Sequence, residues 1–387
     1  MPALSDNDPR KWTYELHTAI KHQILVNYLV PWSMKLGSWR TTLALVDGFA
    51  GRGRFPSGEK GSPLLVLDVA QGALAVPGMR AQRIVCHFVE LNPDNFKNME
   101  AEVALHPASA DPSIYIRLYN TRFSQVSKDI VREIRGNRQP SFFFLDPFGY
   151  RDPPMDTLRE ILVLDQAEVL VNLMFEFANR ALSVQGTPEL SRTLDDLFGS
   201  DRWREFASLE GEERERAFID LYGGQLKKRG AGYVVRFPMG YDESQRTLYY
   251  LVHATKHHKG AILMKDEMVK VSTPGELGYA GTTRHHSRPL FRFDADALPD
   301  ALLRRFDGRS STFEDLIIET VEDNSATREP DYRKALKKLR SDGKVTVISV
   351  DSSGRGLTGR DVIIFQAPPH VPAESLQQMG LWGSDSR

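Results

Sequence analysis

The segment LALVDGFAGRGRF has the composition of a turn that holds a nucleoside cofactor. An apolar run leads into Asp47, and the turn then contains Phe49, Ala50, Gly51 and Gly53. Glycine lets the backbone bend sharply and approach a ligand that a β-carbon would keep away. In an α/β sheet such a turn follows the first strand, at the edge where ligands bind. We therefore predict that these residues contact a cofactor.

A second acidic residue, Glu90, ends the next apolar run. A carboxylate at the tip of the second strand accepts hydrogen bonds from the ribose hydroxyls of a nucleoside. Asn120 and Thr121, after the third run, stand where contacts to the adenine ring are expected. S-adenosylmethionine (SAM) fits better than NAD, because Phe55-Pro56 occupies the place of the third glycine in GxGxxG. An acidic residue before the turn also suits the cationic amino-acid end of SAM.

A third motif, SFFFLDPFGY, ends another apolar run with Asp146, Pro147 and Phe148. It is similar to the (D/N)PP(Y/F/W) tetrapeptide of amino-group methyltransferases. There, the acid or amide and a backbone carbonyl accept hydrogen bonds from the target NH2, and the aromatic ring stacks on the base. Here the aromatic residue comes one position early and the second proline is absent. The motif predicts an acceptor site at these residues and leaves two alternatives open: base methylation, or a buried aspartate that caps a turn.

The loop after the glycine turn is basic, with Arg52, Arg54 and Lys60. We predict that these cations hold an anion, either a nucleic-acid phosphate or the carboxylate of the cofactor. The alternative is a solvated loop with ordinary surface charge.

Short apolar runs alternate with helical stretches, which predicts an α/β fold with a parallel sheet covered on both faces. The expected strands are residues 42–46, 84–89, 114–118, 141–145 and 168–174. A helix is expected over 13–36 and a helical insertion over about 190–230, while 233–237 and 248–253 are expected to pair in antiparallel fashion at the sheet edge.

Two helix positions carry more specific expectations. Ser62-Pro63 is the residue pair of an N-cap and a first helical turn. Lys21 and His22, on the first helix, are candidates to fold over the cofactor, but we expect them on a solvated helix face.

The composition changes after about residue 290, and a winged helix is predicted over 306–366. Its layout is a helix over 312–322, a helix from Pro330 to Gly343, and strands over 344–349 and 361–365. The second of these helices carries the cations Arg333, Lys334, Lys337, Lys338 and Arg340. We predict that these cations contact nucleic acid; a solvated surface or a protein contact is the alternative.

The last residues, 367–387, are expected to form a flexible tail. Within it Gln378, Met379, Leu381 and Trp382 are similar to the bacterial sliding-clamp-binding pentapeptide QL(S/D)LF. Leucine and an aromatic residue can anchor in an apolar pocket while glutamine sets the register. The tail thus predicts the sliding clamp as a partner, against the alternative of an unstructured end.

The 387 residues carry a net charge of −1, so any nucleic-acid binding needs a local basic patch. The single cysteine excludes a disulfide framework and a thiolate-rich metal site. His253, His257 and His258 have no carboxylate pair beside them, and no metal site is predicted. The N-terminal segment lacks the apolar core of a signal peptide, and no apolar run reaches the roughly 18–20 residues of a membrane span. We therefore expect a cytoplasmic protein.

Five segments in one order resemble the three-Cys-motif partner (TcmP) family. They are KHQILVNYLVPW, DGFAGRGRF with GSPL, FVELNPDNF, FFFLDPFGY and YYLVHATKHHKGAILMKDEM, within about residues 15–270. The resemblance implies a Rossmann-like class I SAM methyltransferase fold over 41–290, preceded by a helical segment over 1–40 and followed by a winged helix. It also implies a partner with a three-cysteine, radical-SAM-like motif that resembles photoproduct-lyase-type DNA repair enzymes.

The leading hypothesis is a SAM-dependent, methyltransferase-like protein that acts on or near nucleic acid, in DNA repair or modification. The second hypothesis is a non-catalytic or nuclease-associated DNA-binding adaptor built on a methyltransferase fold. A methyltransferase for a small molecule or a protein has little support in the sequence.

Overall fold

The computed structural model describes most of the chain. The described residues are 13–147, 153–183, 187–240, 247–272, 297–323, 328–350 and 357–366. The chain divides into two compact units, Met1–Arg292 with Val321–Ala326, and Phe293–Thr320 with Thr327–Arg387. Within the described ranges, no helix combines the length and the apolar character that crossing a membrane requires.

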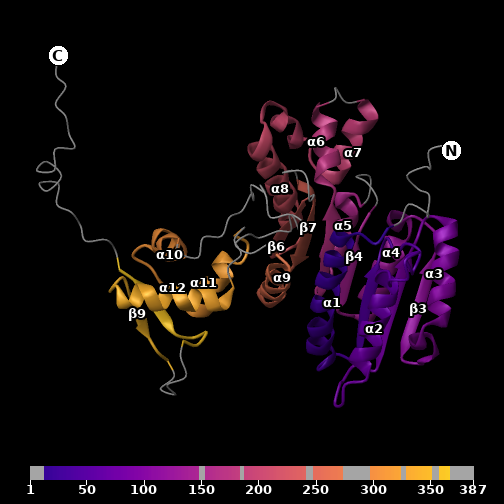
Figure 1. The fold of residues 1–387 in the computed structure, drawn as a ribbon, viewed down its shortest axis with the longest axis horizontal. Coiled ribbons are helices and arrows are strands. Elements are labelled where there is room, and N and C mark those ends of the chain that lie inside the picture. The colour runs from indigo at the N-terminus through magenta and orange to yellow at the C-terminus, as the bar shows by residue number, and fades with distance from the viewer. Residues whose placement is uncertain are drawn as a thin grey trace, which may run out of the picture. The chain divides into compact units, whose positions relative to one another are not determined.

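A seven-stranded sheet forms the centre of the first unit (Figure 1). The strands are β1 (Thr42–Asp47), β2 (Arg83–Val89), β3 (Ile114–Tyr119), β4 (Ser141–Leu145), β5 (Ala167–Leu173), β6 (Tyr233–Gly240) and β7 (Thr247–Thr255). Their order is β3-β2-β1-β4-β5-β7-β6. Strands β1 to β5 are parallel, and β7 runs antiparallel to both of its neighbours. This is the Rossmann-like sheet of class I methyltransferases, which confirms the predicted fold class.

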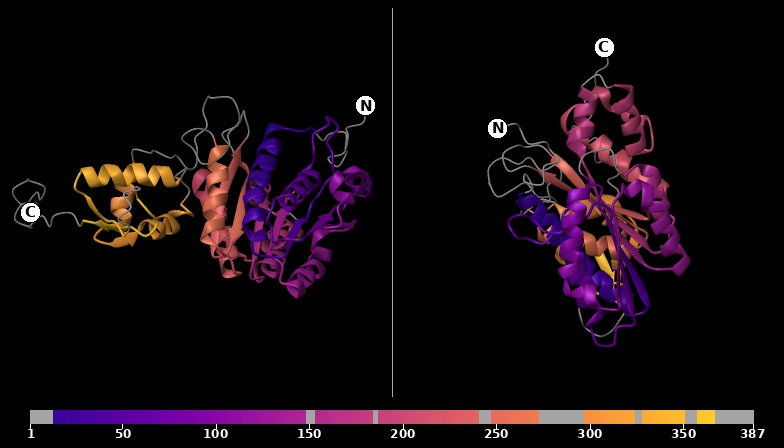
Figure 2. Two further views of the ribbon diagram at one scale, coloured as in Figure 1. Left: turned by 90° about the horizontal axis from the view of Figure 1, so that it is seen from below. Right: turned by 90° about the vertical axis from the view of Figure 1, so that its right-hand side faces the viewer.

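Helices cover both faces of this sheet (Figure 2). They are α1 (Leu16–Gly37), α2 (Ser62–Leu74), α3 (Pro93–Leu105), α4 (Phe123–Asn137), α5 (Met155–Leu162), α6 (Phe175–Ser183), α7 (Pro188–Phe198), α8 (Gly211–Lys228) and α9 (His258–Lys270), with 3-10 helices η2 (Pro107–Ala110) and η3 (Arg202–Ser208). Helix α1 packs against α2 and α9 on one face. On the other face, α4, α5 and α8 enclose a continuous apolar core with alternate residues of the strands.

The order of the strands reverses at β1, which has β2 on one side and β4 on the other. In open α/β sheets, ligands bind outside the carboxyl ends of the strands at such a switch point. The motifs that follow β1 and β4 therefore meet at the edge where a ligand site is expected.

Helix α1 is fastened to the sheet by Glu168 of β5. The Oε1 atom of Glu168 accepts a hydrogen bond from Trp32 Nε1 at 3.1 Å, and its Oε2 atom accepts from the Tyr28 hydroxyl and interacts with His253 Nε2 at 3.0 Å. Trp32, Tyr28 and His253 are all buried. Because Glu168 lies at the amino end of β5, these contacts hold the last turns of α1 there and direct its first turns to the carboxyl edge.

Replacing Glu168 by alanine should lower the free energy of unfolding by about 3 kcal/mol, because three buried donors would lose their shared acceptor. Urea unfolding of Glu168→Ala against the wild type measures this loss. Glu205→Ala is the matched control, since it removes only an exposed ion pair with Arg202 and should cost less than about 1 kcal/mol. Equal losses in the two variants would contradict this role of Glu168.

The second unit is a winged helix. Its elements are α10 (Leu298–Phe306), β8 (Ser310–Thr312), α11 (Phe313–Thr320), α12 (Glu329–Ser341), β9 (Val345–Ile348) and β10 (Val362–Phe365). The three strands form an antiparallel sheet in the order β8-β10-β9. The expected layout of two helices and two strands was incomplete, because α10 and β8 precede them and Leu298, Leu302 and Phe306 belong to the same core. The predicted start at 306 therefore falls at the end of α10.

Candidate cofactor and acceptor site

Four polar residues from different strands lie on one side of the sheet at its carboxyl edge. Asp47 lies opposite Phe144, and Phe144 lies opposite Leu170. Since successive side chains in a strand point to opposite faces, Asp146 and Asn172, each two residues further along, project to the same side as Asp47. Tyr249 of β7 also faces this side, because its ring lies 5.6 Å from Nζ of Lys21 on α1.

Asp47 is completely buried. Its Oδ1 atom accepts a hydrogen bond from the Phe49 backbone N–H at 3.2 Å, whereas its Oδ2 atom has no partner among the described residues. Burial raises the pKa of Asp47 to about 7, and the charges of Asp146 and Glu90 add to the rise. Hydrogen bonds from Ser62 and Phe49 act in the opposite direction. Asp47 therefore lacks a cationic partner within the described protein.

The expected cap of α2 takes a different form. Gly61 is the N-cap residue, and Ser62 is the first residue of the helix, with Pro63 in its first turn. Gly61 provides no side-chain cap, and the Ser62 hydroxyl forms a hydrogen bond with Asp47. Ser62 thus joins the site, a role that its place before a proline did not reveal.

The two glycines of the turn have structural roles within the protein itself. Gly51 has φ +68°, and its N–H donates to Oε2 of Glu90 at 2.9 Å. Gly53 has φ +82°, and a Cβ on it would lie 3.1 Å from the Cα of Met99 on α3. The N–H of Gly61 donates to the Gly53 carbonyl at 2.7 Å. Positive φ angles and close packing thus account for the glycines at positions 51 and 53 without any contact to a ligand.

Glu90 organises the next two loops. Its Oε1 atom accepts a hydrogen bond from the Asn92 N–H at 2.6 Å, and burial raises the pKa of Glu90. Asn120 Nδ2 donates to the Glu90 carbonyl at 2.9 Å. The Thr121 hydroxyl donates to Gln125 at 2.8 Å. Asn120 therefore contacts the end of β2 at Glu90, while Thr121 bonds within its own helix start.

The other two turn residues support the loop. Phe49 packs against Phe123, with 6.0 Å between the ring centroids, on the core face of the sheet. Ala50 is buried, and its N–H donates to the Val89 carbonyl at 2.9 Å. These contacts hold the turn that follows Asp47 against the end of β2.

Asp146 is the centre of a second polar group. Its Oδ2 atom forms an ion pair with Lys21, and its Oδ1 atom accepts a hydrogen bond from Asn172 Nδ2 at 2.8 Å. Asp146 is partly exposed, whereas Pro147 is buried. Phe148, the third predicted acceptor residue, lies outside the described residues. Asp146 is thus held from two sides by groups that the sequence motif did not include.

The expectation of a solvated face for Lys21 and His22 was wrong. Their exposed fractions are 7% and 6%. Burial, with Lys21 nearby, lowers the pKa of His22 to about 4, so its ring is neutral at pH 7. Lys21 shares one helical face with Leu25 and Tyr28, at spacings of four and seven residues, and this pattern could have indicated its burial.

Two cations of the basic loop have acidic partners. Arg54 Nε lies 2.8 Å from Glu102 Oε2, and Lys60 Nζ lies 2.6 Å from Asp68 Oδ2. Arg52, which precedes both of them in the sequence, is half-buried. The pairs fit the alternative of ordinary paired charge, and a contact with an anion stays a prediction.

Helix α12 presents most of its predicted cations to solvent. Lys334, Lys337, Lys338 and Arg340 are exposed. Arg333 instead pairs with Glu329, donates to the Leu357 carbonyl and lies 4.8 Å from the Phe313 ring centroid. Arg333 thus stabilises its own domain, and the exposed cations form a basic strip, defined here as 334, 337, 338 and 340. The tail residues Gln378, Met379, Leu381 and Trp382 lie outside the described residues.

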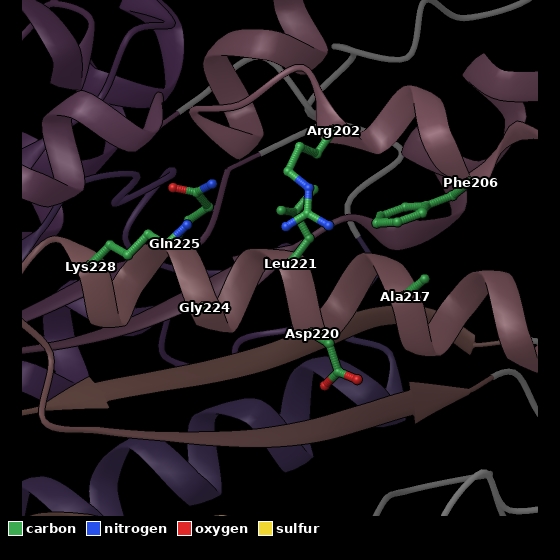
Figure 3. A pocket seen from close by; sticks show the side chains of 8 residues that line it. All are labelled: Arg202, Phe206, Ala217, Asp220, Leu221, Gly224, Gln225 and Lys228. Carbon is green, nitrogen blue, oxygen red and sulfur yellow. The ribbon is translucent and has the colours of Figure 1, made fainter.

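A cavity of about 380 Å³ lies in the helical insertion, between η3 and α8 (Figure 3). Arg202 and Phe206 line it from η3, and Leu221 and Lys228 line it from α8. No predicted site residue lines this cavity. In the described part of the chain, no three His, Cys, Asp or Glu side chains gather in a metal-binding arrangement.

Comparisons with known proteins found one matching family model and several similar solved structures. Residues 280–352 match the model of the GMT-like wHTH domain family. No curated protein matches the sequence. Among solved structures, Trm1 from Pyrococcus horikoshii with S-adenosyl-L-methionine has 13% identity and a TM-score of 0.39 over 92% of each chain. An O-methyltransferase from Bacillus cereus has 10% identity and a TM-score of 0.32 over 61% of this chain and 81% of its own. Spermidine synthase from Thermotoga maritima has 10% identity and a TM-score of 0.31 over 67% of each chain.

Proposed function

We propose that this protein is a SAM-dependent methyltransferase that acts on nucleic acid. The observation that carries the proposal is the meeting of Asp47, Glu90 and Asp146 at the switch point of a methyltransferase-type sheet, where the charges of Glu90 and Asp146 both act on Asp47. A buried carboxylate with an unpartnered oxygen is costly unless a cation approaches it. The ammonium of an amino-acid group is such a cation, which is why the residues fit SAM.

In this proposal each cofactor residue has a distinct task. SAM supplies a methyl group on a sulfonium, which a nitrogen lone pair takes, leaving a neutral thioether and a proton to be lost from nitrogen. Asp47 binds the ammonium of the amino-acid end. Glu90 accepts from the ribose hydroxyls beside the hydrogen bonds that it receives within the protein, those of Gly51 and Asn92 among them. Phe49, Ala50, Gly51 and Gly53 shape the turn, and Asn120 and Thr121 lie on the adenine side.

Asp146, Pro147 and Phe148 are the proposed acceptor residues. Asp146 accepts hydrogen bonds from the target nitrogen and orients its lone pair, so that the residue contributes by positioning. Calorimetric titration with SAM tests the cofactor half of the proposal. Binding with a micromolar dissociation constant is expected, and the absence of heat and of thermal stabilisation at millimolar SAM would contradict it.

The basic strip of α12 is the proposed contact with nucleic-acid phosphates. Lys337→Glu with Lys338→Glu should weaken binding to a DNA duplex and make the slope of log K against log salt less negative by about two, one for each lost phosphate contact. Fluorescence anisotropy over a salt series measures the slope. Lys128→Glu with Arg132→Glu on α4 is the matched control and should leave it unchanged. An unchanged slope in the α12 variant would exclude this surface.

A second candidate function is a non-catalytic DNA-binding adaptor on the same fold. The ion pair between Lys21 and Asp146 favours it, because the acceptor carboxylate already has a cationic partner. An adaptor would bind DNA and show no methyl transfer to DNA or RNA from labelled SAM. A role in DNA repair and a three-Cys-motif, radical-SAM-like partner are supported by the TcmP resemblance alone. The sliding clamp is supported by the tail motif alone, and co-purification with each protein tests these partners.

A further inference from the structure

The amide of Asn172 has an oxygen that the protein does not use. Its Nδ2 atom donates to Asp146 Oδ1 at 2.8 Å, and only the NH2 end of an amide can donate to a carboxylate. The orientation of the amide is therefore determined, and Oδ1 is turned away from Asp146. Asn172 is 6% exposed, and among the described residues Oδ1 has no hydrogen-bond partner. A buried acceptor in this state is destabilising until a donor reaches it.

Asn172 lies level with Asp146 on the proposed acceptor side. Both residues project from neighbouring parallel strands to the face that α1 covers, as the register of β4 and β5 requires. The hydrogen bond from Nδ2 of Asn172 thus holds the Asp146 carboxylate next to an amide whose oxygen is still available as an acceptor. A group with two N–H bonds on one nitrogen matches this pair of acceptors.

Lys21 restricts the charge of the amino group that can bind to Asp146 and Asn172. Its ammonium pairs with Asp146, so the carboxylate is already neutralised and a second ammonium would be repelled. An amine that binds here must therefore be neutral. Aliphatic amines are protonated at pH 7, with a pKa near that of lysine, about 10.4. Amino groups conjugated to an aromatic ring are neutral at this pH.

We infer that Asp146 and Asn172 together bind a neutral, ring-bound amino group, each accepting one of its N–H bonds. The substrate class is then a nucleobase that carries an exocyclic NH2, which includes adenine, cytosine and guanine and excludes thymine. Asn172 takes the role that the motif comparison gave to a backbone carbonyl after Asp146, which accounts for a working site without the second proline. This inference rests on the proposed function, because it places the amino group next to the cofactor.

The test compares the affinities of DNA probes that differ in the number of N–H bonds on the amino nitrogen of one base. Fluorescence anisotropy measures the affinity of the full chain, saturated with S-adenosylhomocysteine, for thymidine 12-mers. One central thymine is replaced by adenine, cytosine or guanine, and each of these is compared with the same base dimethylated on its amino nitrogen. At least one of the three bases should bind about tenfold more tightly than the all-thymine strand, as two new hydrogen bonds predict. Its dimethylated form should return to the affinity of the all-thymine strand.

Two variants test whether Asn172 causes the preference for an amino base. Asn172→Leu should abolish the preference for the amino base. Gln139→Leu is the matched control and should retain it, because Gln139 is an equally buried amide, 6% exposed, that precedes β4 at the opposite edge of the sheet. If Asn172→Leu does not fold, as thermal melting would show, the comparison of probes on the wild type still decides the inference.

Equal wild-type affinity for amino, dimethylated and all-thymine strands would overturn the inference, as would a preference unchanged in Asn172→Leu. Failure of the proposed function would be seen in a different measurement, as the absence of SAM binding in the calorimetric titration. SAM binding without any preference for an amino base would leave the proposed function standing and reject the inference alone.

Discussion

Asp146→Ala should retain SAM binding and transfer methyl groups at least about 100-fold more slowly than the wild type. The carboxylate orients the target nitrogen in our proposal, and loss of such positioning costs a factor of this size. Incorporation of labelled methyl groups from SAM into single-stranded DNA measures the rate, and calorimetry measures binding. Undiminished transfer by Asp146→Ala would reject Asp146 as an acceptor residue.

Removing Asp146 also leaves the ammonium of Lys21 buried without its partner, which destabilises the fold by itself. The double variant Asp146→Ala with Lys21→Met removes both charges and separates the two effects. It should recover stability in urea unfolding and remain slow in methyl transfer. Glu205→Gln, at an exposed position of the helical insertion, controls for effects of substitution that are unrelated to the site, and it should retain the wild-type rate. A double variant that recovers both stability and rate would show that Asp146 matters only as the partner of Lys21.

The affinity for SAM should fall about tenfold for each pH unit below 7. Asp47 has a pKa of about 7 in the free protein, so it is mostly protonated at lower pH. The proposed ion pair with the ammonium of the cofactor needs the carboxylate, and binding must therefore release a proton below pH 7. Above pH 7 the carboxylate is formed, and the affinity should no longer rise with pH. Calorimetric titrations between pH 5.5 and 8 measure this dependence.

Asp47→Asn is the matched variant for this prediction. It should bind SAM on the order of 100-fold more weakly at pH 8, because the ammonium loses its charged partner, and its affinity should no longer fall between pH 7 and 6. His22 does not contribute in this range, since its pKa is about 4. A wild-type affinity that is constant from pH 5.5 to 8 would contradict the role given to Asp47.

The same pKa has a consequence for stability without cofactor. The folded-state pKa of Asp47 is raised above its ordinary value of 3.8, so the folded protein binds the proton more tightly than the unfolded chain. The contribution of this group to stability is therefore present below pH 4 and is lost as the pH rises to 7. Asp47→Asn, which cannot ionise, should be more stable than the wild type in urea unfolding at pH 8.

Local patterns in the sequence were sufficient for the strands of the large sheet. All seven strands of the large sheet occur at the predicted runs. Of these, β1, β2, β4 and β5 are buried on both faces and are therefore nearly continuous in apolar residues. In the second unit, β8 is a three-residue polar strand and α10 follows a long segment without strong periodicity. Helix α10 gains stability from the shared core of the winged helix, and β8 gains it by pairing with β10. A local pattern expresses neither contact.

The sequence by itself determined the fold class, the carboxylates at the ends of β1, β2 and β4, and the basic strip of α12, since each depends on neighbours within one element. Only the tertiary structure decided what surrounds Asp146. Lys21, Asn172 and Tyr249 come from α1, β5 and β7, and they meet because the strand order and the register place these elements together at one edge. The same packing makes their polar atoms buried and leaves Oδ1 of Asn172 without a partner among the described residues. Burial and contact between distant elements are properties of the folded chain, so no single segment of the sequence contains them.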